Sequence, residues 1–234
     1  MEQLRKTHNG AKREFIKSVV YPKDRVLDVG CGRGGDLLKW KSAKVLLTAV
    51  DPDQESIIEA QSRLEGMRAK DGVSSTSAWS ISLGDICSAP PGPYDVICYN
   101  FSLQYIFANQ QLLSSSLDAI RERLDVGGLL IGTIPDSDNI MQLPLKWVDS
   151  LDNSIERGPS IGKGLVGEMI LVKLSDGPYY KYGAIPEPLA HKQILIEELA
   201  HRNFTLIQWT PMLPNKTGLI SDIYSQFIFR KNAV

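Results

Sequence analysis

The stretch that most constrains the fold of this chain runs from Arg25 to Trp40 and reads RVLDVGCGRGGDLLKW. An apolar run ends in an acid, a turn dense in glycine follows, and a leucine-bearing amphipathic segment begins at once. This order predicts a strand, a tight loop and a helix. Because glycine has no Cβ, the loop can adopt positive φ angles and a ligand can approach its backbone closely. The stretch is therefore typical of the nucleotide-binding corner of a doubly wound α/β sheet.

A further acid follows at the distance expected for a nucleoside site. Gly30, Gly32 and Gly35 satisfy the pattern G-x-G-x-x-G, which is a weak signal by itself. Asp51 ends the next apolar run, where a ribose-binding acid is expected about 20 residues further along the chain. The pattern predicts a nucleoside ligand and leaves its identity open.

The charges beside the loop separate the candidate cofactors. Asp28 precedes the glycine loop and Asp36 follows it. The pyrophosphate of a dinucleotide binds the amides at a helix N-terminus and is repelled by nearby carboxylates. A cationic sulfonium with a free ammonium group tolerates both acids. The two acids therefore favour S-adenosylmethionine (SAM) over NAD.

The rest of the chain alternates between expected strands and expected helices. Such alternation predicts a mostly parallel sheet whose ligands gather at the carboxyl ends of the strands. Polar or turn residues follow five of these ends, namely Asp28, Asp51, Asp85, Asn100 and Pro135. Gly127 and Gly128 are expected to end the helix that covers residues 110–124. The expected helices cover residues 4–21, 36–42, 54–70, 110–124 and 189–202, and strands after the first cover 45–50, 77–83, 94–99, 129–133, 204–209 and 223–229.

The regular alternation stops between residues 136 and 188. Residues 136–150 predict a short helix, and residues 165–174 and 179–183 predict an antiparallel hairpin joined by the turn at Ser175–Pro178. We expect a single domain over residues 1–234 that carries residues 136–188 as an insertion.

Composition excludes several classes of protein. No apolar run reaches the roughly 18 residues of a membrane span, and no signal-peptide pattern opens the chain, so we expect an intracellular protein without membrane contact. The 3 cysteines and 3 histidines form no metal-ligand pattern, so neither a metal nor a disulfide is expected. The net charge of −1 limits any contact with nucleic acid to local basic groups.

Several stretches resemble the mRNA cap guanine-N7 methyltransferases. Residues 26–40 are very similar to the cofactor loop of that family, in which the tail GGDLLKW is distinctive. The resemblance covers nearly the whole chain and implies a class I SAM-dependent methyltransferase (Rossmann-like) fold, with a seven-stranded, mostly parallel sheet, a C-terminal antiparallel hairpin and an inserted cap-binding segment. Five further stretches agree in order, namely residues 8–12 (HNGAK), 94–105 (YDVICYNFSLQY), 131–135 (IGTIP), 185–187 (IPE) and 223–231 (IYSQFIFRK).

The resemblance also implies residue roles. SAM would be held by Lys12, Gly30, Gly32, Asp51, Asp85, Asn100 and Tyr105, with Asp28 supporting the loop. The phosphates or ribose of the cap would contact Asn9, Arg33, Lys39 and Arg63. The guanine would lie among Phe101, Gln104, Pro135, Glu187 and Tyr224.

The implied reaction is transfer of the SAM methyl group to N7 of the cap guanine by in-line displacement. Guanine N7 already presents a lone pair, so the reaction needs no general base, and positioning alone can contribute ~7–11 kcal/mol. Glu187 would accept hydrogen bonds from N1 and the exocyclic amine of guanine and so stabilise the charge that develops on the ring. Glu187 and Tyr105 would thus act by positioning.

Two positions depart from the cellular enzymes. Gln104 stands where these usually carry His, and Asn100 where many carry Gln. Together with the short chain, this resembles a viral version, such as the C-terminal domain of a multifunctional capping enzyme from a large DNA virus. The implied partners are capped RNA and other domains of a capping enzyme, and the location is the host cytoplasm or virion for a viral protein and the nucleus for a cellular one.

Three other functions share part of these features. A SAM methyltransferase that acts on a small metabolite or a protein would need the cofactor residues but not the arginines for phosphate. A non-catalytic cap-binding subunit would keep the fold and lose methyl transfer. The presence of the cofactor residues argues against such a loss, namely Asp28, Gly30, Asp51 and Asp85. An NAD-linked oxidoreductase is disfavoured by Asp28 and Asp36.

Overall fold

A sheet of order β10-β11-β5-β4-β1-β2-β3 organises the molecule in the computed structural model, which describes residues 2–71, 76–175 and 183–233. The first five strands along the chain pair in parallel, and β10 and β11 add an antiparallel hairpin at one edge. This confirms the predicted sheet. Its strands are β1 (Arg25–Val29), β2 (Leu46–Asp51), β3 (Ser80–Leu83), β4 (Tyr94–Asn100), β5 (Leu124–Pro135), β10 (Phe204–Pro211) and β11 (Tyr224–Lys231).

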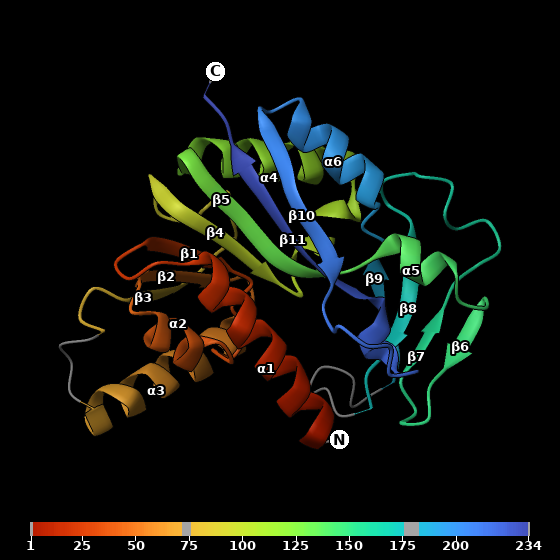
Figure 1. Ribbon diagram of the computed structural model, residues 1–234, viewed down its shortest axis with the longest axis horizontal. Coiled ribbons are helices and arrows are strands. Elements are labelled where there is room, and N and C mark those ends of the chain that lie inside the picture. The colour runs from red at the N-terminus through yellow and green to blue at the C-terminus, as the bar shows by residue number, and fades with distance from the viewer. Residues whose placement is uncertain (1, 72–75, 176–182, 234) are drawn as a thin grey trace.

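Helices cover both faces of this sheet (Figure 1). Side chains alternate along a strand, so neighbours such as Val26 and Leu27 of β1 are buried in separate cores on opposite faces. Both faces are therefore apolar, as a parallel sheet requires. One face carries α1 (Glu2–Val19), α2 (Leu37–Ala43) and α3 (Gln54–Asp71), and the other carries the 3₁₀ helix η1 (Leu103–Ala108), α4 (Gln110–Arg123) and α6 (Lys192–Ala200).

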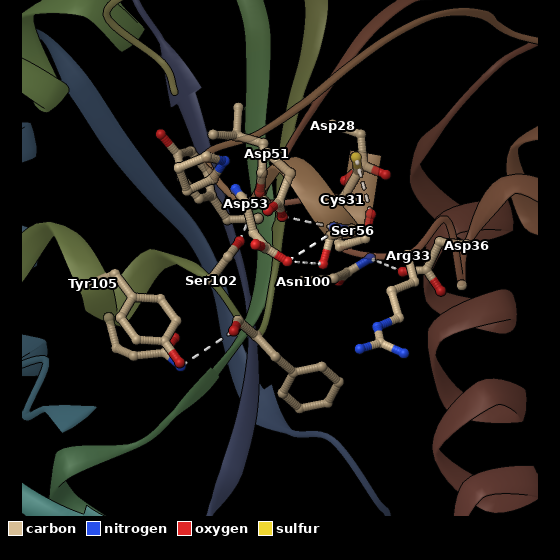
Figure 2. Close-up of a pocket in the computed structure, with 18 of the residues that line it drawn as sticks. Asp28, Cys31, Arg33, Asp36, Asp51, Asp53, Ser56, Asn100, Ser102 and Tyr105 are labelled. Atoms are coloured by element: carbon tan, nitrogen blue, oxygen red, sulfur yellow. Dashed lines mark hydrogen bonds between the residues drawn. The ribbon is translucent and has the colours of Figure 1, made fainter. Parts of the chain in front are cut away.

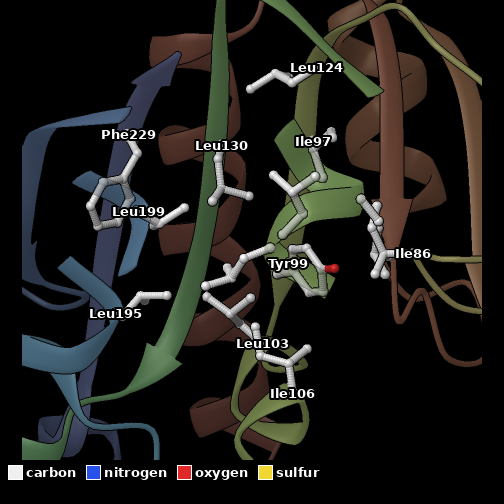
Figure 3. Close-up of a cluster of buried hydrophobic side chains, with 14 of the residues drawn as sticks. Ile86, Ile97, Tyr99, Leu103, Ile106, Leu124, Leu130, Leu195, Leu199 and Phe229 are labelled. Atoms are coloured by element: carbon white, nitrogen blue, oxygen red, sulfur yellow. The ribbon is translucent and has the colours of Figure 1, made fainter. Parts of the chain in front are cut away.

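The core on the α4 and α6 face is the larger one (Figure 3). Leu130 of β5 and Phe229 of β11 pack there against Leu195 and Leu199 of α6. Toward β3, Tyr99 of β4 lies beside Ile86 in the same cluster.

The strand order reverses at β1. The chain runs outward from β1 to β2 and β3 and then returns to place β4 on the other side of β1. At such a reversal the loops after the two central strands separate and leave a crevice at the carboxyl ends. The glycine loop follows β1, and η1 follows β4, so both border this crevice.

The insertion forms a second sheet of order β6-β7-β8-β9, all antiparallel. Its apolar side packs Ile155, Ile170 and Val172 against Tyr224 at the start of β11. The expected turn and second hairpin strand fall largely outside the described residues, and β8 pairs with β9 instead. The elements are α5 (Ser137–Met141), β6 (Lys146–Val148), β7 (Ser154–Glu156), β8 (Met169–Lys173), β9 (Ile185–Pro188) and, near β11, the 3₁₀ helix η3 (Ile220–Ile223).

The prediction for Gly127 and Gly128 is wrong. Helix α4 already ends at Arg123, and both glycines lie inside β5. Leu124 pairs with Tyr94 and Leu129 with Val96, so extra residues of β5 bulge out between these pairs. Gly127 adopts a φ of 80° there, which explains why the bulge needs a glycine.

Candidate active site

A pocket of about 1190 Å³ opens at the carboxyl ends of the parallel strands. Figure 2 shows Tyr105 on one side of it and Arg33 and Asp36 on the opposite side. The sequence-predicted residues that line it are Lys12, Asp28, Gly30, Gly32, Arg33, Asp51, Arg63, Asp85, Asn100, Phe101, Gln104, Tyr105, Pro135, Glu187 and Tyr224. Asn9 and Lys39 are not among the residues that line the pocket.

The glycine loop is locked onto the neighbouring strands. The backbone amides of Gly30 and Cys31 donate to the carbonyl oxygen of Val50, at 2.8 and 3.1 Å. Gly30 has a φ of +75°, and a Cβ at this position would lie 2.4 Å from Cβ of Ser102. Only glycine fits here, because both the backbone angle and the space exclude a side chain. The loop therefore closes directly on the segment after β4.

Asp51 connects the glycine loop to the end of β2. Its Oδ2 accepts a hydrogen bond from the backbone amide of Gly32 at 2.7 Å, and its Oδ1 accepts one from that of Asp53 at 2.9 Å. A carboxylate has about four acceptor sites, so each oxygen can accept one more bond. Asp51 can thus bind a pair of hydroxyl groups while it holds the loop.

Asp85 lies at the next strand end on the same rim. Its Oδ1 accepts hydrogen bonds from the backbone amide and the hydroxyl of Ser88, both at 2.9 Å. Burial by itself would raise the pKa of Asp85, but the bonds from Ser88 lower it below its ordinary value. Asp85 is therefore an exposed, ionised acceptor for a donor group.

Asp36, which was not among the predicted binding residues, is the centre of a charged cluster. Lys12 Nζ and Lys39 Nζ each lie 2.7 Å from Asp36 Oδ1, and the amide nitrogen of Asn100 lies 3.0 Å from Oδ2. Burial would raise the pKa of Asp36, but the two lysines outweigh it and lower the pKa to about 2. The sequence signal was the acid directly after the glycine loop; its partners come from α1, α2 and β4.

Lys39 and Asn9 belong to this cluster rather than to the pocket wall. Lys39 is only 4% exposed, and its Nζ also donates to Asn9 Oδ1 at 2.8 Å and to the carbonyl oxygen of Gly35 at 3.2 Å. Its position, one helical turn after Asp36, directs its ammonium group to that carboxylate. Neither Lys39 nor Asn9 lines the pocket, so their predicted contact with the cap remains a prediction.

Asp28 is buried beneath the loop. The indole nitrogen of Trp40 donates to Asp28 Oδ2 at 2.8 Å. Burial, followed by the negative charge of Asp36, raises the pKa of Asp28 to about 7. A bound cation above this carboxyl group would favour its ionised form.

Replacing Asp28 with asparagine is expected to stabilise the ligand-free protein more at pH 8 than at pH 5. A carboxyl group with a raised pKa holds its proton more tightly in the folded chain, so its destabilising effect grows as the pH rises from about 4 to about 7. Asparagine keeps an acceptor for Trp40 and has no such cost. Thermal unfolding of both proteins at the two pH values measures the effect, and an equal difference at both would contradict it.

Aromatic rings form the opposite end of the pocket. The rings of Phe101 and Tyr224 meet edge to face, with centroids 4.8 Å apart, and the ring of His8 lies 5.9 Å from that of Tyr224. Lys12 Nζ lies 5.4 Å from the centre of the Phe101 ring. His8, which had no predicted role beyond the stretch HNGAK, lies in α1 and lines the pocket.

A buried amide and a carboxylate lie beside these rings. Gln104 Nε2 donates to the carbonyl oxygen of Phe101 at 3.1 Å and lies 3.3 Å from Glu187 Oε2. Both side chains are at least 95% buried, and Gln104 Oε1 has no hydrogen-bond partner among the described residues. Acceptor groups in an apolar pocket favour a flat ligand with N–H donors on its edge.

Two arginines also line the pocket. Arg33 contacts Glu59 Oε2 at 3.1 Å, and Arg63 pairs with the other oxygen of the same carboxylate. Both arginines are partly exposed, and each guanidinium has further N–H donors. The pair can therefore hold a phosphate bridge that crosses the rim.

The described residues contain no group of three or more His, Cys, Asp and Glu side chains that could hold a metal ion. Within the same part of the chain, no helix is both long and apolar enough to cross a membrane.

Solved structures of similar shape are SAM-related methyltransferases. CcbJ methyltransferase from Streptomyces caelestis superposes with a TM-score of 0.67 at 13% identity, over 97% of this chain and 90% of that chain. The glycopeptide N-methyltransferase MtfA in complex with SAM gives a TM-score of 0.65 at 15% identity, over 96% and 87% of the two chains. At these identities the similarity shows the fold alone, and it confirms the predicted fold class.

Sequence relatives are more specific. The mRNA cap guanine-N(7) methyltransferase of Cryptococcus neoformans var. neoformans serotype D is 34% identical over 60% of this chain and 21% of its own length. The enzyme of the same name from Saccharomyces cerevisiae is 33% identical, over 59% and 33%. Enzyme 1 from Oryza sativa subsp. japonica is 30% identical, over 64% and 42%. The chain thus spans less than half the length of these relatives.

These relatives come from fungi and a plant, so they do not support the expected viral version. The model of the mRNA (guanine-N(7))-methyltransferase domain matches residues 1–161, which is more than half of the 234 residues. The predicted family is thereby confirmed, and the chain belongs to the mRNA (guanine-N(7))-methyltransferase domain family.

Proposed function

We propose that this chain transfers a methyl group from SAM to N7 of the guanine that caps mRNA. The observation that carries the proposal is one pocket with two unlike ends: carboxylates surround the glycine loop, and buried aromatic, amide and carboxylate groups lie opposite. The first end suits a cationic nucleoside and the second suits a purine. The family to which the chain belongs supports SAM and the cap guanine as these two ligands.

The donor groups fit the cofactor. Asp51 has free acceptor sites for the ribose hydroxyls, and Asp85 has one for the adenine amine. Asp28 lines the pocket beneath the glycine loop, where its carboxylate would favour a sulfonium or ammonium group, whereas Lys12 and Lys39 already neutralise Asp36. When bound, SAM supplies an activated methyl group. Lys12 and Asn100 fix the carboxylate of Asp36 and so keep this end of the pocket in place.

The remaining residues act by holding the acceptor base. Phe101 and Tyr224 restrict the plane of the guanine, and Glu187 accepts hydrogen bonds from its N1 and amine. Guanine N7 has a lone pair, so no group has to remove a proton first. Glu187 lies in a buried setting where its negative charge stabilises the positive charge that develops on the ring.

Arg33 and Arg63 are proposed to bind the phosphate bridge, and residues 136–188 to form the cap-binding insertion. The partner is then capped RNA, and the location is inside the cell where such RNA occurs. Because relatives are longer than this chain, association with other capping domains remains a prediction.

One assay tests the proposal. The protein is incubated with tritiated SAM and GpppA-capped RNA, the RNA is digested, and the products are separated. We expect label in 7-methylguanosine, and none on RNA that starts with a triphosphate or is already methylated at N7. Label on another position, or transfer only to a small metabolite or protein, would overturn the proposal.

A further inference from the structure

The pocket continues into a recess below Asp85, on the side of the sheet that faces α4. Its wall is formed by Ile86, Tyr99, Ile106, Leu112 and Ser116. These residues come from β4, η1, α4 and the segment after β3. Apart from two hydroxyl groups the side chains are apolar, and none of the residues was assigned a role from the sequence.

The hydroxyl group of Tyr99 is the unexplained feature of this recess. The side chain is 2% exposed, and its Oη has no hydrogen-bond partner among the described residues. Figure 3 shows this hydroxyl pointing toward Ile86, which also lines the pocket. A buried hydroxyl without a hydrogen-bond partner destabilises the folded protein. Phenylalanine would fill the same place without that cost, so packing does not account for a tyrosine.

Strand geometry explains how Tyr99 reaches the ligand. Successive side chains of β4 point to opposite faces, so Asn100 bonds to Asp36 on the α1 side while Tyr99 lies on the α4 side. The last two residues of β4 therefore reach different parts of one pocket. Asn100 lies in the part with the charged cluster, and Tyr99 lies in the part with Asp85 and Ile86.

We propose that Tyr99 Oη forms a hydrogen bond with the purine base of the cofactor, in addition to the contact that Asp85 makes with the amine of that base. The inference rests on the proposed function, because it assumes a SAM-type ligand. A phenol can both donate and accept a hydrogen bond, so it matches a ring nitrogen or the exocyclic amine of adenine. The bond supplies the partner that Tyr99 lacks in the protein alone.

The test is the variant Tyr99→Phe, with binding of S-adenosylhomocysteine (SAH) measured by calorimetry. We expect the affinity to fall five- to tenfold, while the melting temperature of the ligand-free protein stays the same or rises. SAH affinity falls while the melting temperature does not, because the hydroxyl forms a hydrogen bond only with the ligand. A role in the core alone would not produce this combination.

Tyr94→Phe is the matched control. Tyr94 lies on the same strand and is also buried, but its hydroxyl donates to the carbonyl oxygen of Pro90 at 3.1 Å, and it does not line the pocket. This variant is expected to lower the melting temperature and leave SAH affinity unchanged. If Tyr99→Phe binds SAH as tightly as the unchanged protein, or melts lower like Tyr94→Phe, the inference is wrong. If the unchanged protein fails to bind SAH, the proposed function fails with it.

Discussion

Replacing Asp51 with alanine is expected to abolish measurable SAH binding. The carboxylate has two acceptor sites left for the ribose hydroxyls after it bonds to the amides of Gly32 and Asp53. Two hydrogen bonds to a charged group contribute roughly 1.5–3 kcal/mol each. Their loss predicts a decrease in affinity of about 100-fold or more, at tenfold for each ~1.4 kcal/mol. Isothermal titration calorimetry measures the effect.

Asp51→Asn separates ribose binding from loop structure. Its amide oxygen can still accept from Gly32, so the loop should keep its position, but the negative charge and one acceptor are gone. We expect affinity between those of the unchanged protein and the alanine variant. Asp95→Ala serves as a control, since Asp95 bonds to Arg25, does not line the pocket and is expected to affect stability more than binding. Unchanged SAH affinity in Asp51→Ala would refute the cofactor site.

Replacing Glu187 with alanine is expected to lower kcat/KM for capped RNA about 100-fold, the typical size for a group that stabilises charge in a transition state. The side chain is 4% exposed, so water cannot replace its carboxylate easily. SAH affinity should remain unchanged, because Glu187 lies at the guanine end of the pocket. Initial rates of 7-methylguanosine formation at varied RNA concentration measure the effect.

Glu168→Gln is the matched control for this variant. Glu168 is also a buried acid near the second sheet, but it bonds to His191 and to the backbone amides of Gly162 and Lys163, away from the pocket. Its replacement should affect stability and leave the rate with capped RNA close to normal. If Glu187→Ala keeps its rate within about threefold, which corresponds to only ~0.7 kcal/mol, the proposed role of Glu187 is wrong.

That Asp28, Asp51 and Asp85 line one pocket could be predicted because these acids lie at the ends of successive strands. Asp28, Asp51 and Asp85 each end or follow a parallel strand, and parallel strands present their carboxyl ends at one edge of the sheet. Apolar runs that end in an acid identified the first two of those strands. Convergence of the three acids on one pocket then required no further information.

The second sheet was predicted only in part, because its strands are short. β6 and β7 have three residues each, too few to show alternation; β6 pairs with β7, and β7 pairs with β8. Without this sheet the packing of Ile155 and Ile170 beneath Tyr224 could not be foreseen. The family resemblance placed Glu187 in the site, whereas the pairing of β9 with β8 explains how it gets there.

The amino-acid sequence alone determined the order of strands and helices in the main sheet, the glycine loop and the family, since each depends on residues that are neighbours in the chain. Tertiary structure alone decided which polar groups are available to ligands. Lys39 bonds to Asp36 and Asn9, whereas the hydroxyl of Tyr99 has no partner among the described residues. Both residues lie in elements that the sequence predicts, yet their partners could not be predicted. The physical reason is that the partner of a side chain depends on contacts between distant segments, which periodicity and spacing do not encode.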